Sequence, residues 1–283
     1  MTSPQPGACL VCGGTSFETV LEFEAPDAYE RAAGVLEAGY RRRWLRCQGC
    51  AFHQSDYSRP PEILDRLYET TYRDAQAAWR GGDTRAIFER VIALPPEESE
   101  TVARVDWISR SIQDLASAGF VSWSDAERRM LDIGGATGVF AHAFANAGWS
   151  ATVIDPADSG AFLAELGIEY RQMAYQPGLC ASRFHLVSLV FVLEHLRDPI
   201  SVLTECRQDL VAPDGLVYVE VPDALAFQRK PPDDDIFNSC HLWMFDPAAL
   251  VAIMASAGLQ VAKLDRTRTR RGHLALRALG QAR

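Results

Sequence analysis

A short apolar strand that runs into a glycine-rich turn and then a helix most restricts how this chain can fold. Residues 130–133 (Met-Leu-Asp-Ile) predict the strand, Gly134, Gly135 and Gly138 the turn, and residues 139–147 the helix. Glycines at such a turn let a ligand approach the backbone closely. In an open α/β sheet the turn lies at the carboxyl ends of the strands, where such sheets bind ligands. The segment therefore predicts a ligand-binding α/β domain.

Beyond this turn, strand and helix patterns alternate to the end of the chain. Expected strands are 150–155, 168–171, 185–193 and 216–221, expected helices are 161–166, 200–210 and 247–257, and a hairpin of 259–264 and 273–279 closes the chain. The run 185–193 is continuously apolar, as in strands that are buried on both faces. The alternation predicts a doubly wound parallel sheet.

Four cysteines in two pairs of equal spacing lie near the start of the chain: Cys9, Cys12, Cys47 and Cys50. Two thiolates from one Cys-x-x-Cys turn can face the same ion, and two such turns complete a tetrahedral zinc shell. The alternative is a pair of reduced surface turns or a redox dithiol. Because four thiolates leave no position for water, we expect a structural zinc ion rather than a catalytic one.

The chain divides into three predicted parts. Residues 1–58 form a small zinc-ribbon-like domain, which ends before Pro60-Pro61. Residues 59–101 form a helical linker, with a helix expected over 62–72. A helix whose apolar residues recur from Val102 to Leu115 opens the main domain, 102–283.

The glycine turn does not match two common nucleotide motifs. From Gly134, the dinucleotide pattern Gly-x-Gly-x-x-Gly meets Ala136 and then Val139, and no Gly-Lys-Ser/Thr follows for a P-loop. An aspartate at the end of the next strand, Asp155, can accept both hydroxyls of an adenosine ribose. The turn and Asp155 together indicate an adenosine-containing ligand.

In these segments the chain resembles the class I S-adenosylmethionine-dependent methyltransferases. The resemblance runs from about Val102 to the C-terminus and rests on residues 131–138, 153–156, 184–199 and 210–222. It implies a Rossmann-like, doubly wound seven-stranded sheet with an antiparallel last strand, and S-adenosylmethionine as cofactor. Ala136 departs from the family, which usually has glycine there, and we expect the substitution to be tolerated.

The same resemblance implies which residues bind the cofactor. Asp132 and the glycine turn would hold its methionine part, and Asp155 its ribose. Pro156 with Met173 or Ala174 would flank the adenine, and the backbone at Val190 and Phe191 would border the sulfonium.

With the four cysteines added, nearly the whole chain is similar to the zinc-bearing branch that includes nucleotide-sugar C-methyltransferases. In that branch a linker tyrosine lies over the cofactor, and Tyr72 matches it. His241 matches the histidine that acts as base, and His195 is a second candidate. The branch usually has a tyrosine three residues before the histidine, where this chain has Asn238. This departure makes an oxygen or nitrogen acceptor at least as expected as carbon.

Composition favours a small-molecule enzyme. The net charge of −9 is unfavourable for a broad nucleic-acid surface, although Arg41, Arg42, Arg43 and Arg46 form one basic run. The first residues do not resemble a signal peptide, and seven cysteines without one indicate a reducing, cytoplasmic location. We expect methylation of a sugar or natural-product intermediate, with no membrane partner. The alternatives are an RNA methyltransferase with a zinc module and a non-catalytic S-adenosylmethionine-binding protein.

Overall fold

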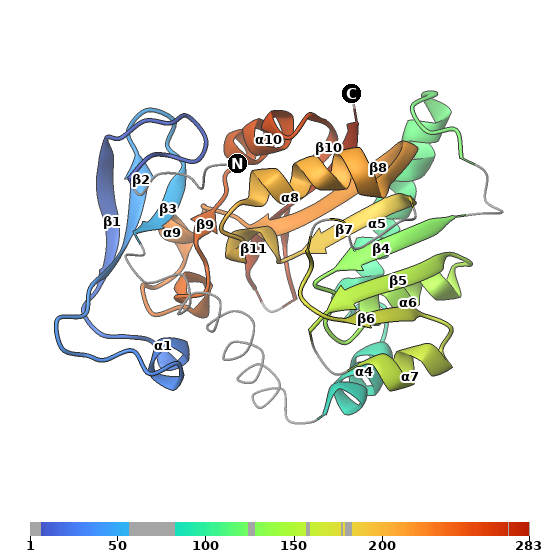
Figure 1. The fold of residues 1–283 in the computed structure, drawn as a ribbon, viewed down its shortest axis with the longest axis horizontal. Helices are drawn as coiled ribbons and strands as arrows, with labels where there is room; N and C mark the ends of the chain where they lie inside the picture. Colours follow the sequence, from blue (N-terminus) through green and yellow to red (C-terminus); the bar gives the residue numbers. More distant parts are fainter. Residues whose placement is uncertain are drawn as a thin grey trace.

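The computed structural model describes residues 7–56, 83–123, 128–156, 159–176, 178, 183–270 and 272–282. The strands in these ranges form two sheets, a four-stranded one near the N-terminus and a seven-stranded one (Figure 1). Within this part of the chain, no helix is both long and apolar enough to cross a membrane.

The seven-stranded sheet has the strand order β10-β11-β8-β7-β4-β5-β6. Its strands are β4 (Arg129–Ile133), β5 (Ser150–Asp155), β6 (Glu169–Gln172), β7 (Phe184–Val190), β8 (Val211–Pro222), β10 (Leu259–Arg268) and β11 (Leu274–Ala282). Strands β6, β5, β4, β7 and β8 pair in parallel, and β11 is antiparallel to both of its neighbours. The predicted seven-stranded Rossmann-like sheet with an antiparallel last strand is confirmed.

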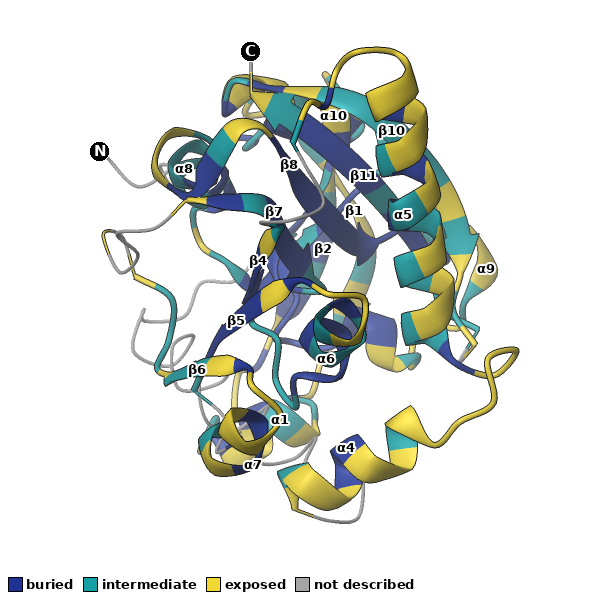
Figure 2. Ribbon diagram, turned by 90° about the vertical axis from the view of Figure 1, so that its right-hand side faces the viewer, coloured by how far each residue is buried: buried dark blue, intermediate teal, exposed yellow. Residues whose placement is uncertain are grey.

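Helices cover both faces of this sheet (Figure 1). On one face lie α4 (Thr84–Ile92), α5 (Glu100–Ser117), α6 (Val139–Asn146) and α7 (Gly160–Glu165). On the other lie α8 (Pro199–Glu205), which continues as one π-helical turn, η4 (Cys206–Leu210), and α10 (Pro247–Ser256). The central strands are buried, whereas α4 and the outer side of α5 are exposed (Figure 2).

The sequence explains this two-faced burial. Side chains alternate along a strand, so Met130 of β4 packs with the α5–α6 side and Leu131 with the α8–α10 side. Helix α10 begins where Asp246 accepts a hydrogen bond from the backbone N–H of Ala249, with Pro247 at its first position. Parallel strands that are covered on both sides need a nearly continuous run of apolar residues, and residues 184–190 follow this pattern except at His185 and Ser188.

The N-terminal sheet is completed by a strand from the far end of the chain. Its order is β1 (Phe17–Phe23), β2 (Arg42–Cys47), β3 (His53–Asp56) and β9 (Trp243–Met244), and the short helix α1 (Ala28–Ala32) lies between β1 and β2. Trp44 of β2 is fully buried and packs edge-to-face on Phe227 of α9 (Ala226–Arg229), with ring centroids 5.6 Å apart. The cysteine-bearing segment is therefore packed firmly against the 224–245 region.

Three local features differ from the predictions. The apolar strand expected to reach residue 193 ends at Val190, because Phe191 has a positive φ of 54° and a 3₁₀ turn, η3 (Leu193–His195), follows. Helix α4 was not expected, and a second 3₁₀ turn, η5 (Asp235–Phe237), lies in the Pro/Asp loop. The predicted helix 62–72 lies outside the described residues. The three-part division of the chain stays a prediction, with α5 crossing the expected 101/102 boundary.

Candidate functional site

The glycine turn packs tightly between β4, β5 and the segment after β7. Gly134 has φ +72°, its N–H donates to the Ile154 carbonyl, and a Cβ there would lie 2.6 Å from a methyl of Val192. A Cβ on Gly135 would lie 2.5 Å from Oδ2 of Asp132. Both positions therefore require glycine, and the turn holds its backbone directly over a carboxylate.

Asp155 ties the end of β5 to this turn. It is fully buried, and its Oδ2 accepts a 2.9 Å hydrogen bond from the backbone N–H of Ala136. Ala136 has φ +46°, the left-handed region that favours glycine, and the Ser159 hydroxyl donates to its carbonyl at 3.1 Å. Alanine in place of the family's usual glycine at position 136 was expected to be tolerated. The two hydrogen bonds, one to the N–H and one to the carbonyl of Ala136, hold the residue in this conformation.

Asp132 lies beneath the turn, at the same edge of the sheet. The Ser188 hydroxyl of β7 donates to its Oδ1 at 2.7 Å. Burial raises the pKa of Asp132 to about 7, and the nearby Asp155 carboxylate acts in the same direction. A cationic group of a ligand bound here would favour the ionised carboxylate.

The residues expected around the adenine and the sulfonium lie at the same edge. Pro156 follows β5, and the N–H of Met173, just after β6, donates to the Asp155 carbonyl at 3.1 Å. Ala174 is the next residue and is half-buried. Val190 ends β7 and Phe191 follows it, with the Phe191 N–H donating to the Glu220 carbonyl at 2.8 Å.

An ion pair that the sequence analysis missed, between Arg104 and Glu220, lies next to Phe191. Arg104 of α5 makes a two-pronged ion pair with the Glu220 carboxylate, at 2.7 and 2.8 Å, and its guanidinium lies 5.8 Å from the centre of the Phe191 ring. The Tyr218 hydroxyl donates to the same carboxylate at 2.6 Å. A carboxylate inside the apolar run 217–221 is the signal that could have predicted such a partner, because buried charges are paired.

The two candidate histidines meet beside η3. The rings of His195 and His241 pack edge-to-face, with centroids 4.8 Å apart. Nδ1 of His195 lies 2.8 Å from the Cys240 carbonyl, and Nδ1 of His241 lies 2.8 Å from the Ile236 carbonyl. Since a carbonyl can only accept, each Nδ1 carries the proton. Burial lowers the pKa of His241 to about 4, so its imidazole is neutral at physiological pH.

Glu194 joins these histidines and was not singled out from the sequence. Its side chain is fully buried, and one carboxylate oxygen lies 3.9 Å from Nε2 of His195. Burial raises the pKa of this carboxyl well above its usual value. Its position directly before His195, at the end of an apolar strand, is the sequence signal that could have found it.

Asn238, which stands where the resemblance led us to expect tyrosine, has a local structural role. Its side-chain amide donates to the Asp235 carbonyl at 2.7 Å and accepts from the Cys240 N–H at 2.9 Å. It thereby fixes the turn that carries His241. Tyr72, expected to lie over the cofactor and to assist catalysis with His241 and His195, lies outside the described residues.

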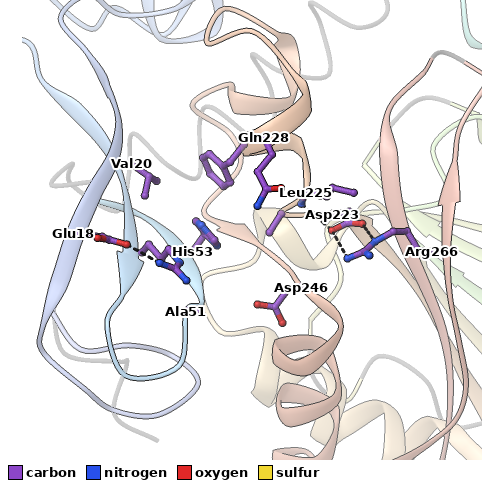
Figure 3. A pocket seen from close by; sticks show the side chains of 12 residues that line it. Glu18, Val20, Ala51, His53, Asp223, Leu225, Gln228, Asp246 and Arg266 are labelled. Atoms are coloured by element: carbon purple, nitrogen blue, oxygen red, sulfur yellow. Dashed lines mark hydrogen bonds and ion pairs between the residues drawn. The ribbon is translucent and has the colours of Figure 1, made fainter.

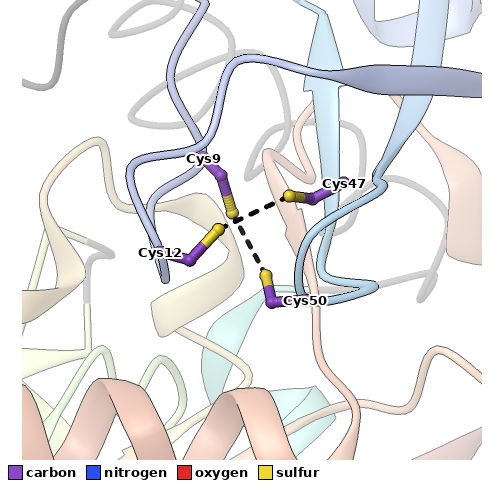
Figure 4. A group of neighbouring side chains, drawn as sticks. All are labelled: Cys9, Cys12, Cys47 and Cys50. Carbon is purple, nitrogen blue, oxygen red and sulfur yellow. Dashed lines mark hydrogen bonds between the residues drawn. The ribbon is translucent and has the colours of Figure 1, made fainter.

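The four N-terminal cysteines converge on one point (Figure 4). Their Sγ atoms all lie within 4.8 Å of one another, with Cys9–Cys50 and Cys12–Cys47 at 3.5 Å. A tetrahedron with Zn–S bonds of about 2.3 Å has sulfur–sulfur edges of about 3.8 Å. Each pair lies in a tight turn, closed by bonds from Gly13 N–H to the Cys9 carbonyl and from Ala51 N–H to the Cys47 carbonyl. The donor set and its spacing fit a zinc ion.

A cavity of about 520 Å³ separates the N-terminal sheet from the end of β8 (Figure 3). Charged and polar side chains line it from both sides, Glu18, Arg46 and His53 from the small sheet and Asp223, Gln228, Asp246 and Arg266 from the large domain, together with apolar side chains such as Val20, Leu225 and Phe227. His53 stacks on Phe227, with centroids 4.5 Å apart, and Arg266 forms an ion pair with the buried Asp223. The cavity therefore offers both polar and apolar contacts to a ligand.

The basic run of the small sheet is neutralised internally. Arg41 pairs with Glu22 at 2.6 Å, Arg46 with Glu18 at 2.8 Å, and Arg43 with Asp56. Arg42 is buried and lies 3.8 Å from Asp27. The arginines of residues 41–46 are therefore poorly suited to bind a polyanion, because carboxylates of the same sheet region already pair with them.

Comparison with known proteins agrees with this geometry. The model of a family described as "Methyltransferase domain" matches residues 105–264. Ubiquinone biosynthesis O-methyltransferase of Actinobacillus pleuropneumoniae is 33% identical over 168 residues, which cover 55% of this chain and 64% of the relative. The enzyme of the same name from Bordetella avium is 30% identical over 170 residues, covering 57% and 63%. The chain thus spans less than two thirds of the length of these curated relatives.

Two solved structures share the fold. The 1,6-didemethyltoxoflavin-N1-methyltransferase of Burkholderia thailandensis, bound to its substrate and S-adenosylhomocysteine, superposes with a TM-score of 0.52 at 15% identity, covering 81% of this chain and 96% of that one. Magnesium protoporphyrin IX methyltransferase of Synechocystis PCC 6803, bound to S-adenosylhomocysteine, gives 0.53 at 14% identity, covering 79% and 100%.

Proposed function

The chain belongs to the methyltransferase domain family that matches its residues 105–264, and we propose that it transfers a methyl group from S-adenosylmethionine to a small-molecule acceptor. One observation carries the proposal. The glycine turn lies over Asp132 and is hydrogen-bonded to Asp155, so that two carboxylates and a backbone segment without side chains lie together at the carboxyl edge of the sheet. This arrangement can hold the ammonium group and the ribose hydroxyls of one ligand. Both similar structures contain S-adenosylhomocysteine.

We place the acceptor between this edge and the small sheet. The cavity beside Asp223 is at the carboxyl end of β8, as the glycine turn is at that of β4, and its mixed lining has polar side chains for the hydroxyl groups of a ligand and apolar ones for its ring or chain. A sugar or a natural-product intermediate fits this chemistry. The curated relatives are named as O-methyltransferases and one structural neighbour as an N-methyltransferase. An oxygen or nitrogen acceptor is therefore favoured over carbon.

The reaction needs little beyond alignment and loss of a proton. The acceptor atom attacks the methyl carbon in line, the carbon–sulfur bond breaks, and S-adenosylhomocysteine leaves. His241 is our candidate for the proton acceptor, because its Nδ1–H is tied to a carbonyl and its Nε2 is the basic atom. His195, whose ring centre lies 4.8 Å from that of His241, would assist it. The catalytic role of Tyr72 stays a prediction from the sequence.

The four cysteines would hold a structural zinc ion that fixes the small sheet against the main domain. Free thiols that serve as metal ligands favour the reducing cytoplasm. RNA is a less suitable acceptor, since the basic run is already paired with carboxylates.

Two measurements test the proposal. Calorimetric titration with S-adenosylhomocysteine tests the cofactor site, and transfer of labelled methyl groups to a panel of sugars, phenols and amines tests the reaction. We expect the protein to bind S-adenosylhomocysteine and to transfer the labelled methyl group to an oxygen or nitrogen atom of an acceptor. Absence of cofactor binding would refute the function. Binding without transfer to any small molecule or RNA would favour a non-catalytic cofactor-binding protein.

A further inference from the structure

We infer that Glu194, His195 and His241 form a second metal site, which binds one divalent transition-metal ion beside the methyl-transfer site. One ligand atom from each residue, a carboxylate oxygen or a ring nitrogen, lies within 4.8 Å of the others. Ligand atoms bound at about 2.1 Å to one ion are at most about 4.2 Å apart. The set can therefore close on an ion through small side-chain rotations.

The orientation of both imidazoles is the first argument. Each ring donates its Nδ1–H to a backbone carbonyl, of Cys240 and of Ile236, at 2.8 Å. Metal-binding histidines are usually held in this way, because the bond fixes the tautomer and directs the other nitrogen toward the ion. Here two adjacent histidines share the arrangement, and Nε2 of His195 is directed toward Glu194, 3.9 Å from Oε1.

The Glu194 carboxylate is the second, independent argument. It is fully buried, and neither of its oxygens accepts a hydrogen bond of ordinary geometry from another residue in the described part of the chain. Buried carboxylates are almost always hydrogen-bonded, paired or bound to a metal. A cation between Glu194 and the two histidines would account for this exception.

The surrounding backbone holds the three ligands in place. The Leu242 N–H donates to the Glu194 carbonyl at 2.7 Å, and His195 is bonded to Cys240, so η3 and the 238–242 turn are fastened together twice. Two imidazoles and one carboxylate form a ligand set suited to Zn²⁺, Mn²⁺, Fe²⁺ or Co²⁺. Three protein ligands also leave room for an oxygen of another molecule.

The ion would act on the acceptor, and this part of the inference rests on the proposed function. A bound acceptor hydroxyl loses its proton to solvent more readily, because the ion stabilises the alkoxide or phenoxide. The oxygen then attacks the methyl carbon while the carbon–sulfur bond breaks. In that case His241 acts as a ligand and not as the proton acceptor.

Equilibrium dialysis of the whole chain, prepared with a single zinc ion per chain for the four cysteines, against Mn²⁺, and separately against Co²⁺, tests the site. Neither the cofactor nor an acceptor is needed, and Mn²⁺ does not displace zinc from thiolates. We expect one additional ion per chain, and an affinity reduced more than about tenfold in Glu194→Gln and in His241→Asn. His142→Asn, on α6, is the matched control and should bind the ion as the wild type does.

The outcomes separate this inference from the proposed function. No additional ion of either metal in the wild type, or equal uptake by all variants, would overturn the metal site. Retained binding of S-adenosylhomocysteine shows that a variant is folded. Uptake of the ion without any methyl transfer would refute only the proposed function, and full transfer in protein without the ion would overturn only the role of the ion in the reaction.

Discussion

The backbone N–H of Ala136 donates a hydrogen bond to the Asp155 carboxylate at 2.9 Å, which joins the glycine turn after β4 to the end of β5. The two residues belong to different strand–helix units, so the bond fixes the distance between the two halves of the proposed cofactor site. Only one oxygen of the carboxylate makes this bond. In the proposed cofactor site the same carboxylate would position the turn and accept a ribose hydroxyl.

Replacing Asp155 with asparagine tests this double role. The amide keeps an oxygen for the Ala136 N–H but loses the charge that binds two hydroxyls. Hydrogen bonds to charged groups contribute about 1.5–3 kcal/mol, so we expect S-adenosylhomocysteine to bind roughly 10- to 100-fold more weakly by calorimetric titration. Asp106→Asn, an exposed position on α5, is the control. Equal affinities for both variants would exclude Asp155 from the cofactor site.

Alanine substitutions at Gly134 and Gly148, which have similar φ angles, distinguish the cost of backbone strain from the cost of a steric clash. At Gly148, with φ +84°, an alanine methyl group would have no atom within 4 Å, whereas at Gly134, with φ +72°, it would lie 2.6 Å from Val192. We expect Gly148→Ala to lower the free energy of unfolding by about 1–2 kcal/mol without changing cofactor affinity. Gly134→Ala should lose more stability and also lose binding. Urea unfolding and calorimetry check both; identical losses would mean that the contact with Val192 is unimportant.

Cofactor affinity should depend on pH through Asp132. Its pKa is about 7 in the folded protein against a usual value of 3.8, chiefly because it is buried. The folded state therefore holds the proton more tightly, and stability of the cofactor-free protein falls as the pH rises between these two values. A ligand ammonium group favours the ionised carboxylate, so affinity for S-adenosylhomocysteine should rise from about pH 5.5 to about pH 7, by at most about tenfold per pH unit. Asp132→Asn should bind weakly and show no such rise.

Loss of the proposed zinc ion should loosen the small sheet more than the large one. Cys12→Ser removes one thiolate, so the variant should contain at least one zinc fewer per chain by elemental analysis. Amide hydrogen exchange should then accelerate in β2 and β3, and also in β9, because β9 pairs with β3. Cys206→Ala, in the buried π turn, is the control and should keep its zinc. Unchanged metal content in Cys12→Ser would contradict the four-cysteine site.

Much of the large domain could be predicted from the sequence. Most strands and helices from residue 129 onward fall within a few residues of their expected bounds, because side-chain periodicity and glycine or proline turns are local properties. The glycine turn, Asp132 and Asp155 could be recognised for the same reason. Strand β8 begins at Val211 rather than at 216, and the short elements α9, η5 and β9 were not expected. Another difference, at residues 191–193, arises where the Phe191 N–H bonds to the Glu220 carbonyl of the neighbouring strand, a contact that no local pattern records.

The convergence of the four cysteines was also predicted from their spacing, since each Cys-x-x-Cys turn fixes its own two sulfurs. The tertiary structure alone brings Glu194 to His241, pairs Arg104 with Glu220, and adds β9 to the N-terminal sheet. These contacts join residues between about 50 and 190 positions apart. Their geometry follows from how the helices and sheets pack, whereas the sequence determines which residues can pair once packing brings them together.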